Sequence, residues 1–131
     1  MAALCWFRTD LRIEDQPALA SAVSDGDAIA LFIASPAQWH EHADAPVKVD
    51  FWLRGLHALK SELAALNIPL KWLQVDHWKD VPEALLAFCK EHGIDTVHCN
   101  REHGVNERRR DRNCYRLLKE HDITMTGHHG G

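Results

Sequence analysis

The chain alternates between short β-rich runs and longer segments with helical periodicity. The β-rich runs cover residues 3–7, 28–33, 70–75, 96–99 and 123–126, and the helical segments cover 17–23, 47–66, 81–92 and 105–121. Strand and helix in strict alternation, with short links, predict parallel strands joined by right-handed crossovers. We therefore predict one α/β domain over residues 1–131, a Rossmann-like three-layer α/β/α fold with a five-stranded parallel sheet.

The helical segment 47–66 has the clearest apolar stripe. Its large apolar residues recur at spacings of three and four, which places them on one helix face: Phe51, Trp52, Leu56, Leu59, Leu63 and Leu66. We expect this face to pack on the sheet. Asn67 and Gly93 stand where two of the helices should end, because both residue types tolerate the left-handed backbone of a C-terminal cap.

Charge and cysteine usage narrow the function classes. The net charge of −4 gives no general attraction to nucleic acid or to anionic membranes. The apolar runs are too short to span a bilayer. The N-terminus has no cationic region followed by an apolar stretch, so we predict no signal peptide. None of the four cysteines forms a Cys-x-x-Cys pair, which predicts reduced, buried thiols in a cytoplasmic protein. We expect a monomer without a membrane partner.

Three polar segments follow predicted strands: residues 8–12, 35–42 and 100–108. In open α/β sheets, ligands bind beyond the carboxyl ends of the strands, so these segments are candidates for one binding edge. The loop 34–46 is the longest in the chain, and long loops in compact domains are often functional. The sequence has no Gly-x-Gly-x-x-Gly motif, no Walker loop and no nucleophile elbow. We predict no catalytic residues.

Three motifs, in order, carry a family resemblance. The stretches CWFRTDLRIEDQPAL (5–19), LFIASPAQW (31–39) and NREHGVNERRRD (100–111) resemble the N-terminal domain of DNA photolyases and cryptochromes. The similarity runs from Leu4 to about His121 and is closest to bacterial cyclobutane pyrimidine dimer photolyases. The resemblance implies a domain that holds a light-harvesting antenna cofactor, methenyltetrahydrofolate or a deazaflavin, and passes excitation energy to FAD.

The rest of such a protein is a C-terminal helical domain, which in this family holds FAD and binds damaged DNA. By the resemblance, this chain is an excised antenna domain that lacks the helical domain. The parent is then a carbon–carbon lyase that splits pyrimidine dimers in light. We expect the 131 residues alone to bind no FAD, to repair no DNA and to hold folate weakly. Two alternatives remain: the same domain of a cryptochrome, which signals in blue light, and a universal-stress-type nucleotide-binding protein.

The resemblance also implies three cofactor-binding residues. The family's folate-binding histidine falls at His42, and the family's folate-recognising pair falls at Asn106 and Glu107. A carboxylate can accept the adjacent N–H donors of a pterin ring, and an amide suits the neighbouring pterin acceptors. The alternatives are a surface histidine at position 42 and a helix start at 106–107, where Asn caps and Glu interacts with the helix dipole. His40 and His42 could suggest a metal, but a third ligand with matching spacing is not visible, so we predict no metal.

Two groups of charged residues have simpler interpretations. We interpret Arg8, Asp10 and Arg12 as a scaffold network in which Asp10 neutralises a neighbouring arginine, with contact to an anionic cofactor as the alternative. We interpret the basic run Arg108–Arg112 as a solvated, ion-paired helix face rather than a nucleic-acid patch, because Glu102, Glu107 and Asp111 lie within helical reach.

Overall fold

A computed structural model describes residues 2–35 and 46–129, and of residues 46–49 and Trp52 it describes the backbone alone. The predicted strands and helices are all present, with boundaries shifted by at most two residues. In chain order they are β1 (Ala2–Phe7), α1 (Pro17–Asp25), β2 (Asp27–Ala34), α3 (Pro46–Ala65), β3 (Leu70–Gln74), the single turn η1 (Trp78–Asp80), α4 (Val81–His92), β4 (Ile94–Asn100), α5 (Val105–Glu120) and β5 (Thr124–His128).

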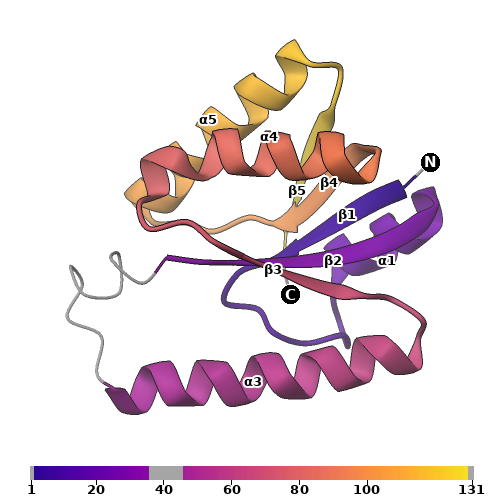
Figure 1. Cartoon of the computed structure of the whole chain (residues 1–131), viewed down its shortest axis with the longest axis vertical. Coiled ribbons are helices and arrows are strands. Elements are labelled where there is room, and N and C mark those ends of the chain that lie inside the picture. Colours follow the sequence, from indigo (N-terminus) through magenta and orange to yellow (C-terminus); the bar gives the residue numbers. More distant parts are fainter. Residues whose placement is uncertain (1, 36–45, 130–131) are drawn as a thin grey trace.

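The five strands form one sheet in the order β3-β2-β1-β4-β5, and every neighbouring pair is parallel. This confirms the predicted sheet. β1 is central, and the order reverses direction between β1 and β4 (Figure 1). At such a switch point the crossovers leave on opposite sides of the sheet, so a crevice opens beyond the carboxyl ends of the two strands.

Alternate residues of β1 face two separate cores. Leu4 and Trp6 pack with apolar residues of α4 and α5, while Ala3, Cys5 and Phe7 pack with residues of α1 and α3. This division follows from the two-residue period of a strand, and it makes β1 buried on both faces. The molecule is therefore a three-layer sandwich, with α4 and α5 on one side of the sheet and α1 and α3 on the other (Figure 1).

Helix α3 buries a narrower stripe than the sequence predicts. Leu56, Leu59 and Leu63 are buried as expected. Phe51, however, is 73% exposed, because it lies five residues before Leu56 and thus about 140° around the helix from it. Leu66 is 52% exposed, because the helix ends at Ala65 and Leu66 lies in the following turn. The Trp52 side chain lies outside the described residues, so its predicted packing stays a prediction.

Both predicted helix ends are confirmed by backbone geometry. Asn67 and Gly93 have φ angles of 60° and 64°, in the left-handed region that Asn and Gly adopt most readily. The N–H of Gly93 donates to the carbonyl of Cys89, which satisfies one of the last free carbonyls of α4.

Over the described ranges, the structure contains no helix with the length and apolarity that a membrane span requires.

Candidate functional site

The carboxyl ends of β1 and β4 lie side by side at the switch point. β1 ends at Phe7 and runs into Arg8, and β4 ends at Asn100. Both of these polar residues are buried. Two of the polar segments that the sequence singled out therefore stand where this topology is expected to form a crevice.

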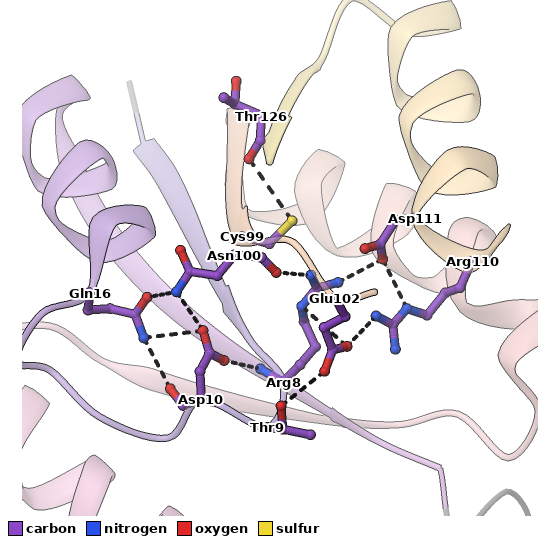
Figure 2. A network of polar contacts seen from close by, with 10 residues as sticks. All are labelled: Arg8, Thr9, Asp10, Gln16, Cys99, Asn100, Glu102, Arg110, Asp111 and Thr126. Atoms are coloured by element: carbon purple, nitrogen blue, oxygen red, sulfur yellow. Dashed lines mark hydrogen bonds and ion pairs between the residues drawn. The ribbon is translucent and has the colours of Figure 1, made fainter. Parts of the chain in front are cut away.

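Arg8 is the centre of a buried ion-pair network (Figure 2). Its Nη1 donates to Oδ1 of Asp111 at 2.7 Å, its Nη2 donates to the backbone carbonyl of Asn100, and its Nε lies 3.9 Å from Oε1 of Glu102. Burial disfavours the charge of Arg8, but its neighbours Cys99, Asp111 and Glu102 outweigh burial, so the pKa of the guanidinium lies above its ordinary value. Arg8 is thus a permanent cation held inside the protein.

Amide side chains complete the network on the other side of Arg8. Asp10 accepts the backbone N–H of Arg8 at 3.0 Å through Oδ1 and the side-chain amide of Asn100 at 2.6 Å through Oδ2. Gln16 donates to the carbonyl oxygens of Asp10 and Arg12 at 3.0 and 3.1 Å and accepts from the Asn100 amide. The N–H of Ala18 donates to Oδ1 of Asn100 at 3.3 Å. The protein's own polar groups therefore fill this part of the crevice.

The scaffold interpretation is confirmed for Arg8 and Asp10, with one correction, whereas the exposed Arg12 side chain donates to neighbouring backbone carbonyls outside the network. Asp10 does not neutralise a neighbouring arginine; it shapes the loop, and the counter-charge of Arg8 is Asp111 on α5. Sequence reasoning missed this pairing because the partners are 103 residues apart. It also missed Asn100 and Gln16, although an amide directly after a buried strand and another directly before a helix-opening proline are usable signals.

Arg110 also differs from its prediction as part of a solvated face. It is buried, it donates to Glu102 at 2.7 Å and to Asp111 at 3.0 Å, and its guanidinium lies 4.7 Å from the ring centre of Trp78 and 5.2 Å from that of Trp6. One face of α5 thus belongs to the core network, because a helix presents position 110 inward while positions 108, 109 and 112 are exposed.

The predicted cofactor-binding pair lies in the first turn of α5. Gly104 is the N-cap, with extended backbone, so Asn106 is not the capping residue that the helix-start interpretation expected. Asn106 is exposed and Glu107 is half-buried. The Glu107 carboxylate folds back over Gly104, in the space that a side chain at 104 would occupy. Among the described residues, nothing donates a hydrogen bond to this carboxylate, which leaves it free to accept donors from a ligand.

His42 and the neighbouring Trp39 and His40 lie outside the described residues. The strand that leads to them, β2, ends at Ala34 and is followed by a buried Ser35 at the same carboxyl edge, on the far side of β1 from β4. The convergence of His42 with Asn106 and Glu107 therefore stays a prediction. Residues 2–35 and 46–129 contain no group of three side chains that could hold a metal ion.

The four cysteines are free and buried. Burial raises the pKa of Cys99 to about 11 and the pKa of Cys89 and of Cys114 to about 12, and it also raises that of Cys5. Thiols with such pKa values are protonated near neutral pH, and a protonated thiol is a poor nucleophile and a poor metal ligand. These side chains contribute packing rather than chemistry.

A Rossmann-like α/β domain with the polar segments 8–12 and 100–108 at its carboxyl edge defines the class of protein. The sequence profile of the DNA photolyase family matches residues 3–131, and the chain belongs to that family. It is 40% identical over 121 residues to a deoxyribodipyrimidine photo-lyase of Vibrio cholerae, an alignment that covers 92% of this chain and 26% of the relative. It is also 44% identical over 72 residues to cryptochrome-1 of Arabidopsis thaliana, covering 54% of this chain and 9% of the relative.

A solved structure agrees with this assignment. The archaeal photolyase of Sulfolobus tokodaii superposes with a TM-score of 0.78 at 26% identity, over 98% of this chain and 29% of the archaeal one. That structure is described as containing two FAD molecules, with the implication of a novel light-harvesting cofactor. The chain spans about a quarter of the length of the photolyase relatives it matches.

Proposed function

We propose that this chain is the antenna domain of a DNA repair photolyase, which holds a light-harvesting chromophore and passes its excitation energy to FAD. The observation that carries the proposal is the Glu107 carboxylate, which accepts no hydrogen bond from any described residue and lies at the start of α5, at the carboxyl edge. The family match of the chain covers nearly its whole length. The archaeal relative supports it, because a light-harvesting cofactor is named for a protein with this fold.

The residues present fit a pterin chromophore. The Glu107 carboxylate can accept the ring N–H and the exocyclic amino group together, and the exposed Asn106 amide can meet the adjacent carbonyl and nitrogen. His42 would complete the site from the loop after β2. When bound, the chromophore absorbs near-ultraviolet or blue light and transfers the excitation by dipole coupling. The protein's part is to fix position and orientation, which requires no nucleophile. Methenyltetrahydrofolate is the proposed chromophore, and a deazaflavin is the alternative.

The remaining functions of the protein belong, in this proposal, to the other three-quarters of a photolyase. FAD and the contact with damaged DNA lie in a C-terminal helical domain, which covers the far side of the antenna site. Light-driven splitting of pyrimidine dimers, a carbon–carbon lyase reaction, needs that domain. We also propose that the protein is cytoplasmic, which the four free thiols support. We propose further that it is a monomer.

Two variants of the full coding product test the proposal. The protein is purified in the dark, and its absorbance is recorded. Glu107→Ala should lose most of the near-ultraviolet folate band and keep FAD. Gly104→Ala should do the same, because the new Cβ would collide with the Glu107 carboxylate and push it out of place.

Glu120→Ala, at the exposed opposite end of α5, is the matched control and should keep both bands. If Glu107→Ala leaves the folate content unchanged, Glu107 does not bind the chromophore and serves only at the start of the helix. A deazaflavin spectrum in the unmodified protein would assign the other chromophore to the site.

A cryptochrome is the second candidate, because the identity to cryptochrome-1 of Arabidopsis thaliana reaches 44% over its aligned segment. The family match favours both candidates over a nucleotide-binding protein of the universal-stress type. Repair of pyrimidine dimers by the illuminated full coding product separates the two candidates: a photolyase repairs them, and a signalling cryptochrome does not.

A further inference from the structure

A hollow lies beside α5, and its lining residues differ from the proposed antenna pair Asn106 and Glu107. It has a volume of about 610 Å³, within the range of small-molecule sites. Residues of the β4 end, α5 and β5 line it: Cys99, Arg101, Glu102, His103, Arg108, Asp111, Arg112, Tyr115, Met125, Gly127 and His129. Neither Asn106 nor Glu107 is among them, so the proposed antenna contacts do not account for this hollow.

The floor of the hollow is apolar, and one side chain crosses it. Cys99 and Met125 are buried there. Arg101 lies over Gly127: a Cβ at position 127 would stand 2.9 Å from Cγ of Arg101. Glycine at this position in β5 therefore lets the arginine cross the strand at close range.

The rim of the hollow carries an excess of positive charge. Its two carboxylates, Glu102 and Asp111, are already paired with the buried Arg8 and Arg110. The rim arginines Arg101, Arg108 and Arg112 are exposed, and none of them forms an ion pair with any residue that the structure describes. Three guanidinium groups around one hollow, without an ion pair to any described residue, are notable in a chain whose net charge is −4.

The helix spacing places an aromatic ring beside these charges. Arg108, Arg112 and Tyr115 stand at positions i, i+4 and i+7 of α5, which is one face of a helix. The Tyr115 side chain is 44% exposed, so one part of its ring is available to a ligand. An apolar floor, an aromatic wall and a cationic rim suit a flat ring that carries an anionic group.

We propose that this hollow binds a small phosphorylated ligand with a planar ring, of the nucleoside monophosphate class. Guanidinium groups bind phosphate through paired N–H donors, and Arg108 and Arg112 approach it from one helix while Arg101 approaches from β4. The ring of the ligand lies on the floor against Tyr115. This site is additional to the proposed antenna site and does not depend on it.

Titration of the 131-residue chain with adenosine 5′-monophosphate, by calorimetry and amide NMR shifts, tests the proposal. We expect saturable binding, with shifts centred on Arg101, Tyr115 and Gly127, that weakens as salt rises. Adenosine and inorganic phosphate, tested separately, should each bind at least about tenfold more weakly, since each lacks one half of the recognised chemistry.

Arg108→Ala and Arg112→Ala should each weaken the binding of adenosine monophosphate by about tenfold, which is the loss of one charge-assisted contact. Arg109→Ala and Arg116→Ala are matched controls, because they remove the same charge from the same helix outside the hollow. If the controls lose as much affinity for adenosine monophosphate, the effect is one of general electrostatics and the proposed site is wrong. If Glu107→Ala abolishes the binding of adenosine monophosphate, the ligand lies at the antenna residues, which would also contradict the proposal. No saturable binding at millimolar ligand would also end it.

Discussion

Arg8 and Asp111 show how a buried charge joins distant parts of the chain. The Arg8 side chain is 5% exposed and lies at the end of the central strand, while Asp111 belongs to α5. A buried cation is tolerable only when a nearby anion and several acceptors replace the water it has lost. The pair therefore couples the position of α5 to the end of β1, and through α5 to the candidate antenna residues.

Asp111→Ala should lower the free energy of unfolding by about 3 kcal/mol, because it leaves both Arg8 and Arg110 without their shared acceptor. Urea denaturation followed by circular dichroism measures this. Glu120→Ala removes an exposed carboxylate from the same helix and should change the free energy by less than about 0.5 kcal/mol. Equal effects of the two substitutions would show that the Arg8 network adds nothing beyond general charge.

A second polar cluster links α1, β4 and β5. Nε2 of the buried His98 lies 2.6 Å from Oδ2 of Asp25, and Nδ1 of His98 lies 2.9 Å from Nε2 of His128. Burial lowers the pKa of His128, the charges of His98 and Arg101 lower it further, and Asp25 opposes them. The folded protein therefore binds this proton less readily than the unfolded chain does.

The stability that His128 contributes should be fully present above about pH 6.5, where the histidine is neutral in both states. It should be lost as the pH falls below 6.5 toward the folded pKa, because protons then favour the unfolded chain. Urea denaturation at a series of pH values should show this loss, and His128→Gln should flatten it. His57→Gln, an exposed substitution on α3, should leave the slope in place. If the free energy of unfolding of His128→Gln still falls with decreasing pH, another titratable group causes the loss of stability.

At the scale of elements, α3 contributes one stripe of leucines to the core beneath β1 and β2. Leu59 and Leu63 pack with Ala3, Cys5 and Phe7, and Leu56 packs with Phe32. Phe51 and Leu53 of the same helix do not share this environment, since they are 73% and 46% exposed. Helical period alone therefore overstates how much of a helix is buried.

Leu59→Ala should lower the free energy of unfolding by about 3 kcal/mol, since it removes buried methyl groups and leaves a cavity. The same change at Leu53, in the same helix, should cost less than about 1 kcal/mol. Chemical denaturation of both variants makes the comparison. A Leu59→Ala cost as small as that of Leu53→Ala would mean that α3 does not pack on the sheet as described.

At the scale of the whole molecule, the parallel sheet brings the carboxyl ends of β1, β2 and β4 to one edge, while the described helices lie along the two faces of the sheet (Figure 1). Because the chain spans about a quarter of its photolyase relatives, we expect the rest of such a protein to cover part of this edge. A site closed from two sides loses affinity when one side is missing, because contacts are lost and water competes.

The 131-residue chain should therefore bind methenyltetrahydrofolate weakly, split no pyrimidine dimers under light and show no preference for ultraviolet-damaged DNA. Illumination of the chain with damaged plasmid, followed by a dimer count, checks the activity, and a gel-shift series with damaged and intact DNA checks the preference. Light-dependent repair by these residues alone would contradict the proposed division between antenna and FAD domains.

The sequence by itself determined the fold class and the order of the elements, and it predicted the carboxyl edge as the place of the site. These depend on local pattern: β-rich runs, helical stripes, and the Asn67 and Gly93 ends, each of which neighbouring residues decide. The three motifs also indicated the family to which the chain belongs, because they occur in order along nearly the whole chain.

Only the tertiary structure decided which charges meet. Asp111 neutralises Arg8, Arg110 turns into the core, and Glu102 and Asp111 pair with these two buried arginines. Arg101, Arg108 and Arg112 form no ion pair with any described residue. No local pattern distinguishes the arginines of one basic run, since their side chains are chemically identical. Their roles differ because packing α5 against β4 and β5 places one of them beside buried carboxylates and the others beside solvent.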